Sequence, residues 1–351
     1  MDKVRFAVIG IGGFGLKRIN SILRSEAAEL AYIVDVNEEL TRNLGRKYGI
    51  ESIGFDGLLS RKDYDVVIVA VPNVFHYEIT VQLLEIGRDV WCEKPMTISV
   101  DLAYKMVMKS IEKGAMLKVG SNPRYFPNVL KASELMKRGF IGNALFFRGW
   151  IGNEGLHLLS KSWYRKREMV GGGTLIDNGV HLIDLIRYLV DEIVRCQACR
   201  LATLKHNISE LEDNAVAIYG LSRSGFAFIH SSWTERSGYM YFEVHGDNGY
   251  IHVDSRWSRA IITYGKSDEE PTCEDYTQHP KLSYDLELED FVRDYREGLH
   301  PKPTSYDGYR SVKIIMQSYQ AAATQSPTTT FDSSDEELRE RFLQRFNIRE
   351  T

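Results

Sequence analysis

The stretch VRFAVIGIGGFGLKR, residues 4–18, decides the fold of this chain. Its first six residues are apolar except for Arg5, which is typical of a strand buried on both faces. Gly10, Gly12 and Gly15 follow as GxGxxG, the first for a tight turn, the second for backbone approach to a pyrophosphate, the third for close helix packing. The stretch therefore predicts a dinucleotide site at a helix N-terminus, formed by Gly10, Ile11, Gly12, Gly13, Phe14 and Gly15.

An acidic residue follows the glycine motif at the spacing that is typical of dinucleotide-binding domains. Asp35 ends the second predicted strand, about 20 residues after Gly15, where it can accept hydrogen bonds from an adenosine ribose. A 2′-phosphate would meet like charge at Asp35, and the following Val36 and Asn37 supply no cation to bind it. The sequence therefore predicts NAD as the cofactor and disfavours NADP.

Outward from the motif, short β-branched runs alternate with helical stretches as far as about residue 122, which indicates a parallel sheet with crossover helices. The predicted strands are Arg5–Gly10, Leu30–Asp35, Asp65–Val71, Asp89–Cys92 and Met116–Gly120. We expect a doubly wound α/β domain of the Rossmann type over residues 1–122.

Beyond a helix predicted at 125–137, strands follow one another without helices long enough for crossovers, which indicates an antiparallel sheet. These strands are expected near 144–152, 193–204, 213–221, 225–233, 240–246 and 249–254. Helices are expected at Thr174–Leu189, 284–298, 306–323 and 335–346. The rest of the chain, 123–351, is thus predicted to be an α+β domain, with 332–351 as a helical extension.

Composition narrows the class of partner. The 351 residues carry 44 Lys+Arg and 48 Asp+Glu, a net charge of −4, which does not favour nucleic acid as a partner. The apolar run VVIVAV at 66–71 is too short to cross a bilayer, and basic residues at 17–18 argue against an export signal. Four cysteines fit a reducing cytoplasm, and CQAC at 196–199 reads as a strand, so we expect no metal site.

Three later segments carry reactive groups: CEKP at 92–95, SNPRY at 121–125 and GGGTLIDNGVHLID at 171–184. Lys94 stands at the carboxyl end of a predicted parallel strand, the edge where such sheets bind ligands. Asp177 and His181 are four residues apart on a predicted helix, hence on one face, which Asp184 continues. Histidine can act as a base near neutral pH, and a neighbouring carboxylate can hold its tautomer.

In the order and spacing of these motifs the chain resembles the Gfo/Idh/MocA family. The resemblance rests on GxGxxG, on VPN..H at Val71–His76, on EKP at Glu93–Pro95, on the Arg of SNPRY, on GGG..D.G.H..D at 171–184 and on HGDNG at 245–249. It implies a Rossmann domain joined to an open-faced, mostly antiparallel sheet domain, and NAD(P)-dependent oxidation or reduction of a sugar or cyclitol. It also implies a homodimer or homotetramer formed through that sheet.

The resemblance also implies roles for individual residues. Lys94 and His181 would flank the reacting hydroxyl, with Asp177 orienting His181, and either Lys94 or His181 would accept the proton. The expected cofactor contacts beyond the glycine motif and Asp35 are Val71, Pro72, Asn73, His76, Glu93 and Lys94. Candidates for binding substrate hydroxyls, besides Lys94, Asp177 and His181, are Arg124, Asn153, His157, Tyr164 and Tyr239.

Two other functions remain open on the same residues. One is a glycosidase that retains NAD and acts by transient oxidation, and the other is a non-catalytic dinucleotide-sensing regulator. The presence of Lys94, Asp177 and His181 favours a dehydrogenase over the regulator. At the C-terminus, an apolar stripe of Leu338, Phe342, Leu343 and Phe346 is expected to pack on its own domain or on a sister subunit.

Overall fold

The structure is a computed structural model that describes residues 2–208 and 210–348, with the side chain of His157 outside the described set. The chain forms two compact units. The first comprises Met1–Asn122, Lys281–Tyr309 and Glu336–Thr351, and the second comprises Pro123–Pro280 and Arg310–Asp335. The sequence pattern predicts 281–309 and the C-terminal helix to be part of the second domain, whereas in the structure 281–309 and 336–348 belong to the first unit. The reason is that Leu288, Phe291 and Val292 complete the core of the first sheet, while Phe342 and Phe346 pack on His300 of the same unit.

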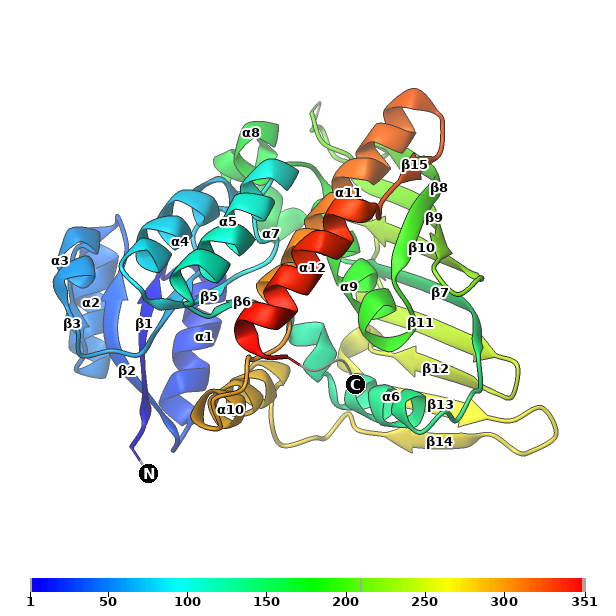
Figure 1. Cartoon of the computed structure of the whole chain (residues 1–351), viewed down its shortest axis with the longest axis horizontal. Coiled ribbons are helices and arrows are strands. Elements are labelled where there is room, and N and C mark those ends of the chain that lie inside the picture. The colour runs from blue at the N-terminus through cyan, green and yellow to red at the C-terminus, as the bar shows by residue number, and fades with distance from the viewer. Residues whose placement is uncertain (1, 209, 349–351) are drawn as a thin grey trace. The chain divides into compact units, whose positions relative to one another are not determined.

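The first unit is built on six parallel strands in the order β3-β2-β1-β4-β5-β6 (Figure 1). They are β1 (Val4–Ile9), β2 (Ala28–Val34), β3 (Glu51–Ser52), β4 (Val66–Val69), β5 (Asp89–Cys92) and β6 (Leu117–Val119). Strand order reverses between β1 and β4, and in sheets of this kind ligands bind at the carboxyl ends of the strands beside such a reversal. The glycine motif and the VPN segment follow these two strands.

Helices connect and cover these strands: α1 (Gly13–Arg24), α2 (Glu38–Tyr48), α3 (Phe55–Ser60), α4 (His76–Glu85), α5 (Val100–Lys113) and, from much later in the chain, α10 (Ser283–Arg296). Helix α1 packs beside α10, and α4 beside α5. Leu288, Phe291 and Val292 of α10 enter the same core as Phe6 and Trp91. The Phe291 ring stacks on Trp91 with a centroid distance of 4.9 Å, so α10 belongs to this unit's hydrophobic core.

The second unit is built on nine strands in the order β14-β13-β12-β11-β7-β10-β9-β8-β15. They are β7 (Ala144–Gly152), β8 (Ile193–Ala202), β9 (Asn214–Leu221), β10 (Phe226–Ser232), β11 (Tyr239–Gly246), β12 (Tyr250–Asp254), β13 (Ile261–Gly265), β14 (Thr272–Asp275) and β15 (Thr328–Thr329). Only β7 and β10 pair in parallel, which the sequence pattern did not indicate. The predicted fold class, a Rossmann-type parallel sheet followed by a mostly antiparallel one, is confirmed.

One face of the second sheet carries its helices, including α6 (Pro127–Lys137) and α9 (Val180–Leu189) (Figure 1). Leu182, Ile183, Leu185 and Ile186 of α9 are fully buried there. Burying each such side chain contributes roughly 1.5–3 kcal/mol. On the strands, burial alternates, so that Phe147 and Ile151 face this core while their neighbours in β7 face outward. The outward face therefore stays open.

Short segments complete the second unit: α7 (Leu156–Leu159), α8 (Arg167–Val170) and a π-helical stretch at Leu175–Gly179 immediately before α9. The predicted helix at Thr174–Leu189 is therefore not one uniform α-helix. Its first turn has the wider i→i+5 spacing, a feature that in proteins is found frequently at functional sites.

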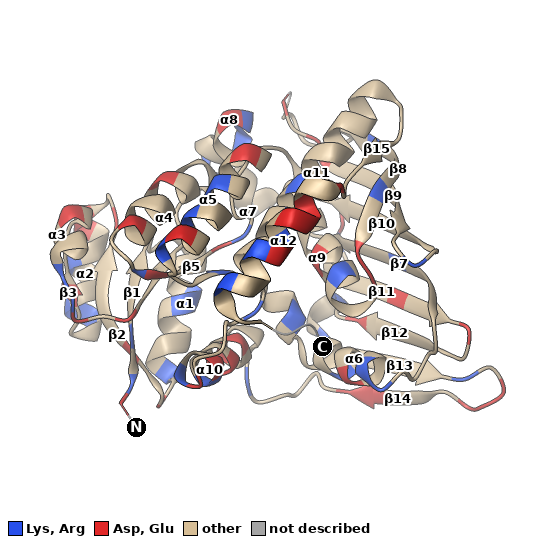
Figure 2. Cartoon of the chain, in the orientation of Figure 1, with Lys and Arg blue, Asp and Glu red and all other residues tan. Residues whose placement is uncertain are grey.

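The last two helices, α11 (Ser305–Thr324) and α12 (Ser333–Phe346), each have residues in both units. In the first unit, Phe342 and Phe346 of α12 pack on His300, with ring centroids 5.3 and 4.8 Å away. The apolar stripe of α12 is thus covered by this same chain. Acidic and basic residues are mixed on α5 and α12 (Figure 2). Among the described residues, no helix combines the length and apolarity that a membrane span requires.

Candidate functional site

The glycine motif closes the turn between β1 and α1 of the first unit. Gly10 has φ +85°, and a Cβ there would lie 2.6 Å from the carbonyl oxygen of Ala70 at the end of the neighbouring strand. A Cβ on Gly15 would overlap the carbonyl oxygen of Gly10. Around Gly12 and Gly13, by contrast, a Cβ would meet no protein atom within 4 Å. Gly10 and Gly15 are thus required by packing, whereas Gly12 and Gly13 keep an open approach to the backbone.

This difference predicts opposite effects of two alanine substitutions. Gly12→Ala should leave the melting temperature unchanged, because φ −71° suits alanine and the space is open. It should weaken NADH binding about 10- to 100-fold, since a methyl group would keep the pyrophosphate from charge-assisted hydrogen bonds with the backbone. Gly15→Ala should destabilise the fold by about 1–3 kcal/mol, because backbone must shift. Fluorescence titration and thermal melting separate the two, and normal NADH affinity in Gly12→Ala would contradict this assignment.

The N-terminus of α1 has the features of an anion-binding site. Gly12 is its N-cap residue and supplies no side-chain hydrogen bond, and the first turn contains no acidic residue. The backbone N–H groups and the positive end of the helix dipole are therefore available to a phosphate. Asp35 lies at the neighbouring strand end, where its carboxylate accepts hydrogen bonds from the backbone N–H groups of Ile11 (2.8 Å) and Asn37 (2.9 Å). These bonds hold Asp35 against the glycine turn, so the residues present fit a bound dinucleotide.

The VPN..H segment begins directly after β4. Pro72 precedes a single 3₁₀ turn at Asn73–Phe75, and α4 starts at His76. The His76 ring is 1% exposed, with Nδ1 2.8 Å from the carbonyl oxygen of Pro95 and Nε2 2.9 Å from that of Val71. Burial lowers the pKa of His76. Through these two contacts the His76 ring connects the loop after β4 to the loop after β5. His76 is therefore expected to position these two loops at the predicted cofactor site.

Lys94 follows β5 and is half-buried. Its ammonium group lies 5.7 Å from the centroid of the Phe14 ring, and that of Lys17 lies 5.1 Å from the same ring. Burial lowers the pKa of Lys17, with a further lowering from the positive charge of Lys94. The fold therefore brings Lys94 to the glycine turn, as the strand-edge argument predicts.

Beneath these loops lies a buried ion-pair network that sequence reasoning missed. Glu93 Oε1 accepts a hydrogen bond from Arg18 Nε at 2.6 Å, and Arg18 Nη1 donates to Glu287 Oε2 at 2.7 Å. Glu287 Oε1 accepts from Lys118 Nζ at 2.7 Å and from the backbone N–H of Ser121 at 3.0 Å. Burial alone would raise the pKa of Glu287, but the adjacent Arg18 and Lys118 lower it to about 2. The network holds Glu93, a predicted cofactor-side residue, in place.

In the second unit, Asp177 lies in the π-helical stretch and is 7% exposed. Its Oδ2 accepts a hydrogen bond from the indole Nε1 of Trp233 at 3.1 Å. Burial and the adjacent Asp177 carboxylate raise the pKa of Tyr164 well above its usual value. The structure thus brings together two predicted site residues, Asp177 and Tyr164, and adds Trp233, which the sequence did not single out.

His181 is the second residue of α9, which follows directly, and is 4% exposed. Its ring lies edge-on to that of Tyr239, another predicted substrate-side residue, with 6.4 Å between centroids. One turn farther, Asp184 binds Arg124 in a bidentate ion pair, with Nε–Oδ2 and Nη2–Oδ1 distances of 2.7 and 2.5 Å. Two of the five N–H donors of the Arg124 guanidinium therefore already bind Asp184.

The remaining predicted substrate-side residues lie after β7. Asn153 Oδ1 accepts from the backbone N–H of Gly155 at 2.7 Å, and its Nδ2 lies 3.4 Å from Asn178 Oδ1. The backbone of His157 lies in α7, while its side chain is outside the described residues. Asn153 is therefore linked to the π-helical stretch that carries Asp177.

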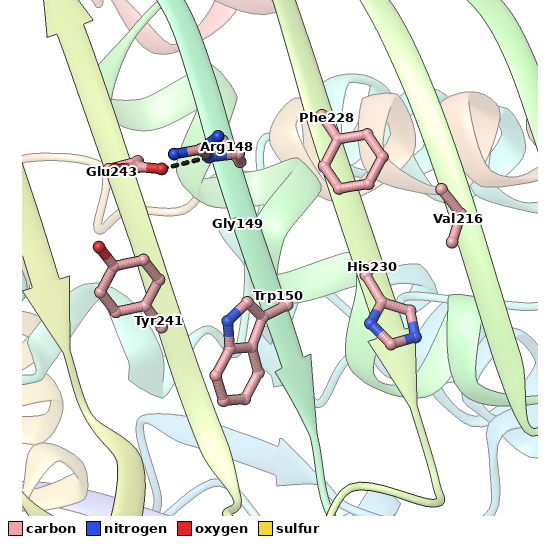
Figure 3. Close-up of a pocket in the computed structure, with 8 residues that line it drawn as sticks. All are labelled: Arg148, Gly149, Trp150, Val216, Phe228, His230, Tyr241 and Glu243. Carbon is pink, nitrogen blue, oxygen red and sulfur yellow. Dashed lines mark hydrogen bonds and ion pairs between the residues drawn. The ribbon is translucent and has the colours of Figure 1, made fainter.

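A separate hollow of about 400 Å³ lies on the outward face of the second sheet (Figure 3). Its side chains come from β7, β9, β10 and β11, and the residues that line it are Arg148, Gly149, Trp150, Val216, Phe228, His230, Tyr241 and Glu243. No predicted catalytic residue is among them. The hollow is a feature of the open sheet face.

Comparisons with known proteins identify the family. A model described as an oxidoreductase family with an NAD-binding Rossmann fold matches residues 4–121, and the GFO/IDH/MocA C-terminal domain matches residues 129–252. Levoglucosan dehydrogenase of Pseudarthrobacter phenanthrenivorans is 26% identical over 81% of this chain and 77% of that protein. The scyllo-inositol 2-dehydrogenase (NAD(+)) of Bacillus subtilis is 24% identical over 89% of this chain and 92% of that protein.

Solved structures show the same fold. Levoglucosan dehydrogenase in complex with NADH superposes with a TM-score of 0.83 at 23% identity, covering 94% of this chain and 100% of that one. The aldose-aldose oxidoreductase of Caulobacter crescentus complexed with glycerol gives 0.84 at 22%, covering 93% and 100%. Since the two family models together cover most of the sequence and agree with both sheets, the chain belongs to the Gfo/Idh/MocA family of NAD-binding oxidoreductases.

Proposed function

We propose that this protein is an NAD-dependent dehydrogenase that transfers hydride between nicotinamide and a hydroxyl-bearing carbon of a cyclitol, sugar or sugar derivative. The observation that carries the proposal is a buried carboxylate and a buried imidazole, Asp177 and His181, at a π-helical distortion. Groups that can move a proton are costly to bury, and they concentrate where chemistry uses them. The named dehydrogenases of inositols and of levoglucosan among the relatives support this substrate class.

The reaction requires removal of a hydroxyl proton as the carbon loses hydride. When bound, NAD supplies the hydride acceptor. His181 accepts the hydroxyl proton in our proposal, and Asp177, held by Trp233, stabilises the imidazolium that results. Lys94 as a cation stabilises the developing alkoxide, and as a neutral amine it could take the proton instead.

Substrate hydroxyls in this proposal are bound by Asn153, His157, Tyr164 and Tyr239. Arg124 was predicted for the same task, but its ion pair with Asp184 favours a role in positioning the helix that carries His181. We further propose that residues 1–122 bind the dinucleotide and that the open sheet in 123–351 binds substrate on one side and a second copy on the other. Homodimers or homotetramers formed through this sheet fit its aromatic outward face, which includes Phe146, Trp150 and Phe228.

A cofactor and substrate screen tests this function. The purified protein should bind NAD more tightly than NADP, and polyols or sugars in the presence of NAD should yield NADH, detected by absorbance. Asp35→Ser should narrow the preference for NAD, because the carboxylate that repels a 2′-phosphate is gone. Tighter binding of NADP by the unsubstituted protein would contradict the cofactor assignment. Cleavage of a glycoside without net formation of NADH would favour the NAD-retaining glycosidase instead.

A further inference from the structure

Three side chains that can ligate a metal, Glu243, His245 and His252, converge on the outward face of the second sheet, and Glu243 also lines the hollow described above. Strands β11 and β12 are antiparallel, with Glu243 directly opposite His252 and His245 directly opposite Tyr250. Residues two apart on a strand share a face, so Glu243 and His245 lie on the same side as His252. Directly opposed and diagonal positions across a strand pair are close enough for side chains to touch.

The ligand atoms form a nearly equilateral triangle. Oε2 of Glu243 lies 3.4 Å from Nε2 of His245 and 3.2 Å from Nε2 of His252, and the two Nε2 atoms are 3.3 Å apart. Zinc binds imidazole nitrogen at about 2.0–2.1 Å and carboxylate oxygen at about 2.0–2.2 Å, so the corners of its tetrahedron are roughly 3.3–3.5 Å apart. The three atoms therefore match one face of a zinc tetrahedron without rearrangement.

The surroundings hold these atoms in place. The other carboxylate oxygen of Glu243, Oε1, is paired with Arg148 (Figure 3), which fixes the carboxylate with Oε2 toward the two imidazoles. The His245 ring stacks on Phe146 at 4.7 Å between centroids, and the His252 ring lies 4.9 Å from that of Tyr250. Hydrogen bonds to a ligating carboxylate and fixed imidazole orientations are what metal sites use to position their ligands.

The hydrogen positions that the two imidazoles allow are compatible with metal binding. At most one hydrogen fits between two Nε2 atoms at this distance, so at least one ring presents a lone pair there. Glu243 is almost fully buried, whereas the side chains of His245 and His252 are 32% and 30% exposed, which leaves an entry path from solvent in the single chain.

We propose that Glu243, His245 and His252 form a binding site for a divalent transition-metal ion of the zinc type. Two imidazole nitrogens and one carboxylate oxygen are a ligand set that zinc accepts with a fourth position left open. The fourth ligand, a water molecule or a group of a second copy seated on this sheet face, would approach from the open side of the sheet. The site is separate from the proposed dehydrogenase chemistry and does not depend on it.

Metal binding to the untagged, full-length protein tests the site. After treatment with a chelator and exchange into metal-free buffer, the protein should take up one Zn²⁺ per chain in equilibrium dialysis with elemental analysis. Co²⁺ should give the visible absorption of a site with imidazole ligands. Each of three substitutions should weaken Zn²⁺ binding more than roughly 100-fold: His245→Ala, His252→Ala and Glu243→Gln. Residues that only hydrogen-bond a metal ligand typically cost less metal affinity than this when they are replaced.

The matched control is His230→Ala, since His230 is a half-buried histidine on the same sheet face but hydrogen-bonds Asn214 instead. It should bind Zn²⁺ like the unsubstituted protein. Circular dichroism and melting without metal check that each variant folds, and the Co²⁺ spectrum reports the ligands without any substitution. The proposal is overturned if the unsubstituted protein binds no stoichiometric Zn²⁺, or if binding survives in His252→Ala. The three groups would then be only a hydrogen-bonded cluster.

Discussion

Alanine in place of His181 is expected to lower kcat by about 10²–10⁴-fold, the usual contribution of a positioned acid or base. Lys94→Ala should cause a loss of similar size, because the positive charge proposed to stabilise the developing alkoxide would be gone. The measurement is steady-state kinetics with the substrate found by the screen, over a range of pH. His181→Ala should also remove the acidic limb of the pH profile of kcat, which reports protonation of the base.

Binding measurements show whether these variants have lost a step of the reaction or have lost their folded binding site. NADH affinity should stay normal in His181→Ala, because His181 belongs to the second unit and makes no predicted cofactor contact. His181→Gln and Lys94→Arg keep size or charge and show which property matters. Full turnover by either alanine variant would mean that the proton and the alkoxide are handled by other residues, and the roles assigned here would be wrong.

The largest expected effect on stability comes from Glu287. Its carboxylate is fully buried between Arg18 and Lys118, so Glu287→Ala would leave two buried cations without their shared partner. Removing one side of such a network costs about 3–5 kcal/mol. Because the folded pKa of Glu287 is lowered from 4.5 to about 2, its contribution is full above about pH 4.5 and is lost as the pH falls toward 2. Urea denaturation monitored near pH 7 measures the loss.

A neighbour on the same helix provides the control. Glu289 pairs with Lys281 at 2.7 Å, but both side chains are about half exposed. Glu289→Ala should therefore cost at most about 1 kcal/mol. If Glu287→Ala were no less stable than Glu289→Ala, the buried network would contribute little to folding. The network would then serve mainly to hold Glu93 in place through Arg18, and weaker NADH binding by Glu287→Ala would show this.

Much of the first unit could be predicted because its features are local. Strand positions follow from short apolar runs, and the spacing of Gly10, Gly12, Gly15 and Asp35 is itself a sequence pattern. The contacts that explain Gly10 and Asp35, with Ala70 and Ile11, become visible only in the structure. The motif order also predicted the family and the NAD-binding fold, which the family comparisons confirmed. The individual site residues remain predictions that the kinetic and binding experiments above must test.

The features that could not be predicted join distant parts of the chain. Arg18 meets Glu287 across 269 residues, and Asp177 meets Trp233 across 56, with no motif linking either pair. The π-helical turn was also missed, because i→i+4 spacing in the sequence predicts a regular helix and gives no sign of the wider turn. Glu243 and His252 show no familiar ligand spacing in the sequence, so their approach to His245 across the strand pair could not be predicted either.

By itself, the sequence determined the two kinds of sheet, the dinucleotide motif and the presence of Lys94, Asp177 and His181, because periodicity and turn chemistry depend on neighbouring residues. The tertiary structure decided which buried charges pair, how α10 completes the first core and which side chains share a face across strands. These depend on strand register and on burial, which single out one set of long-range partners only when the whole unit is packed.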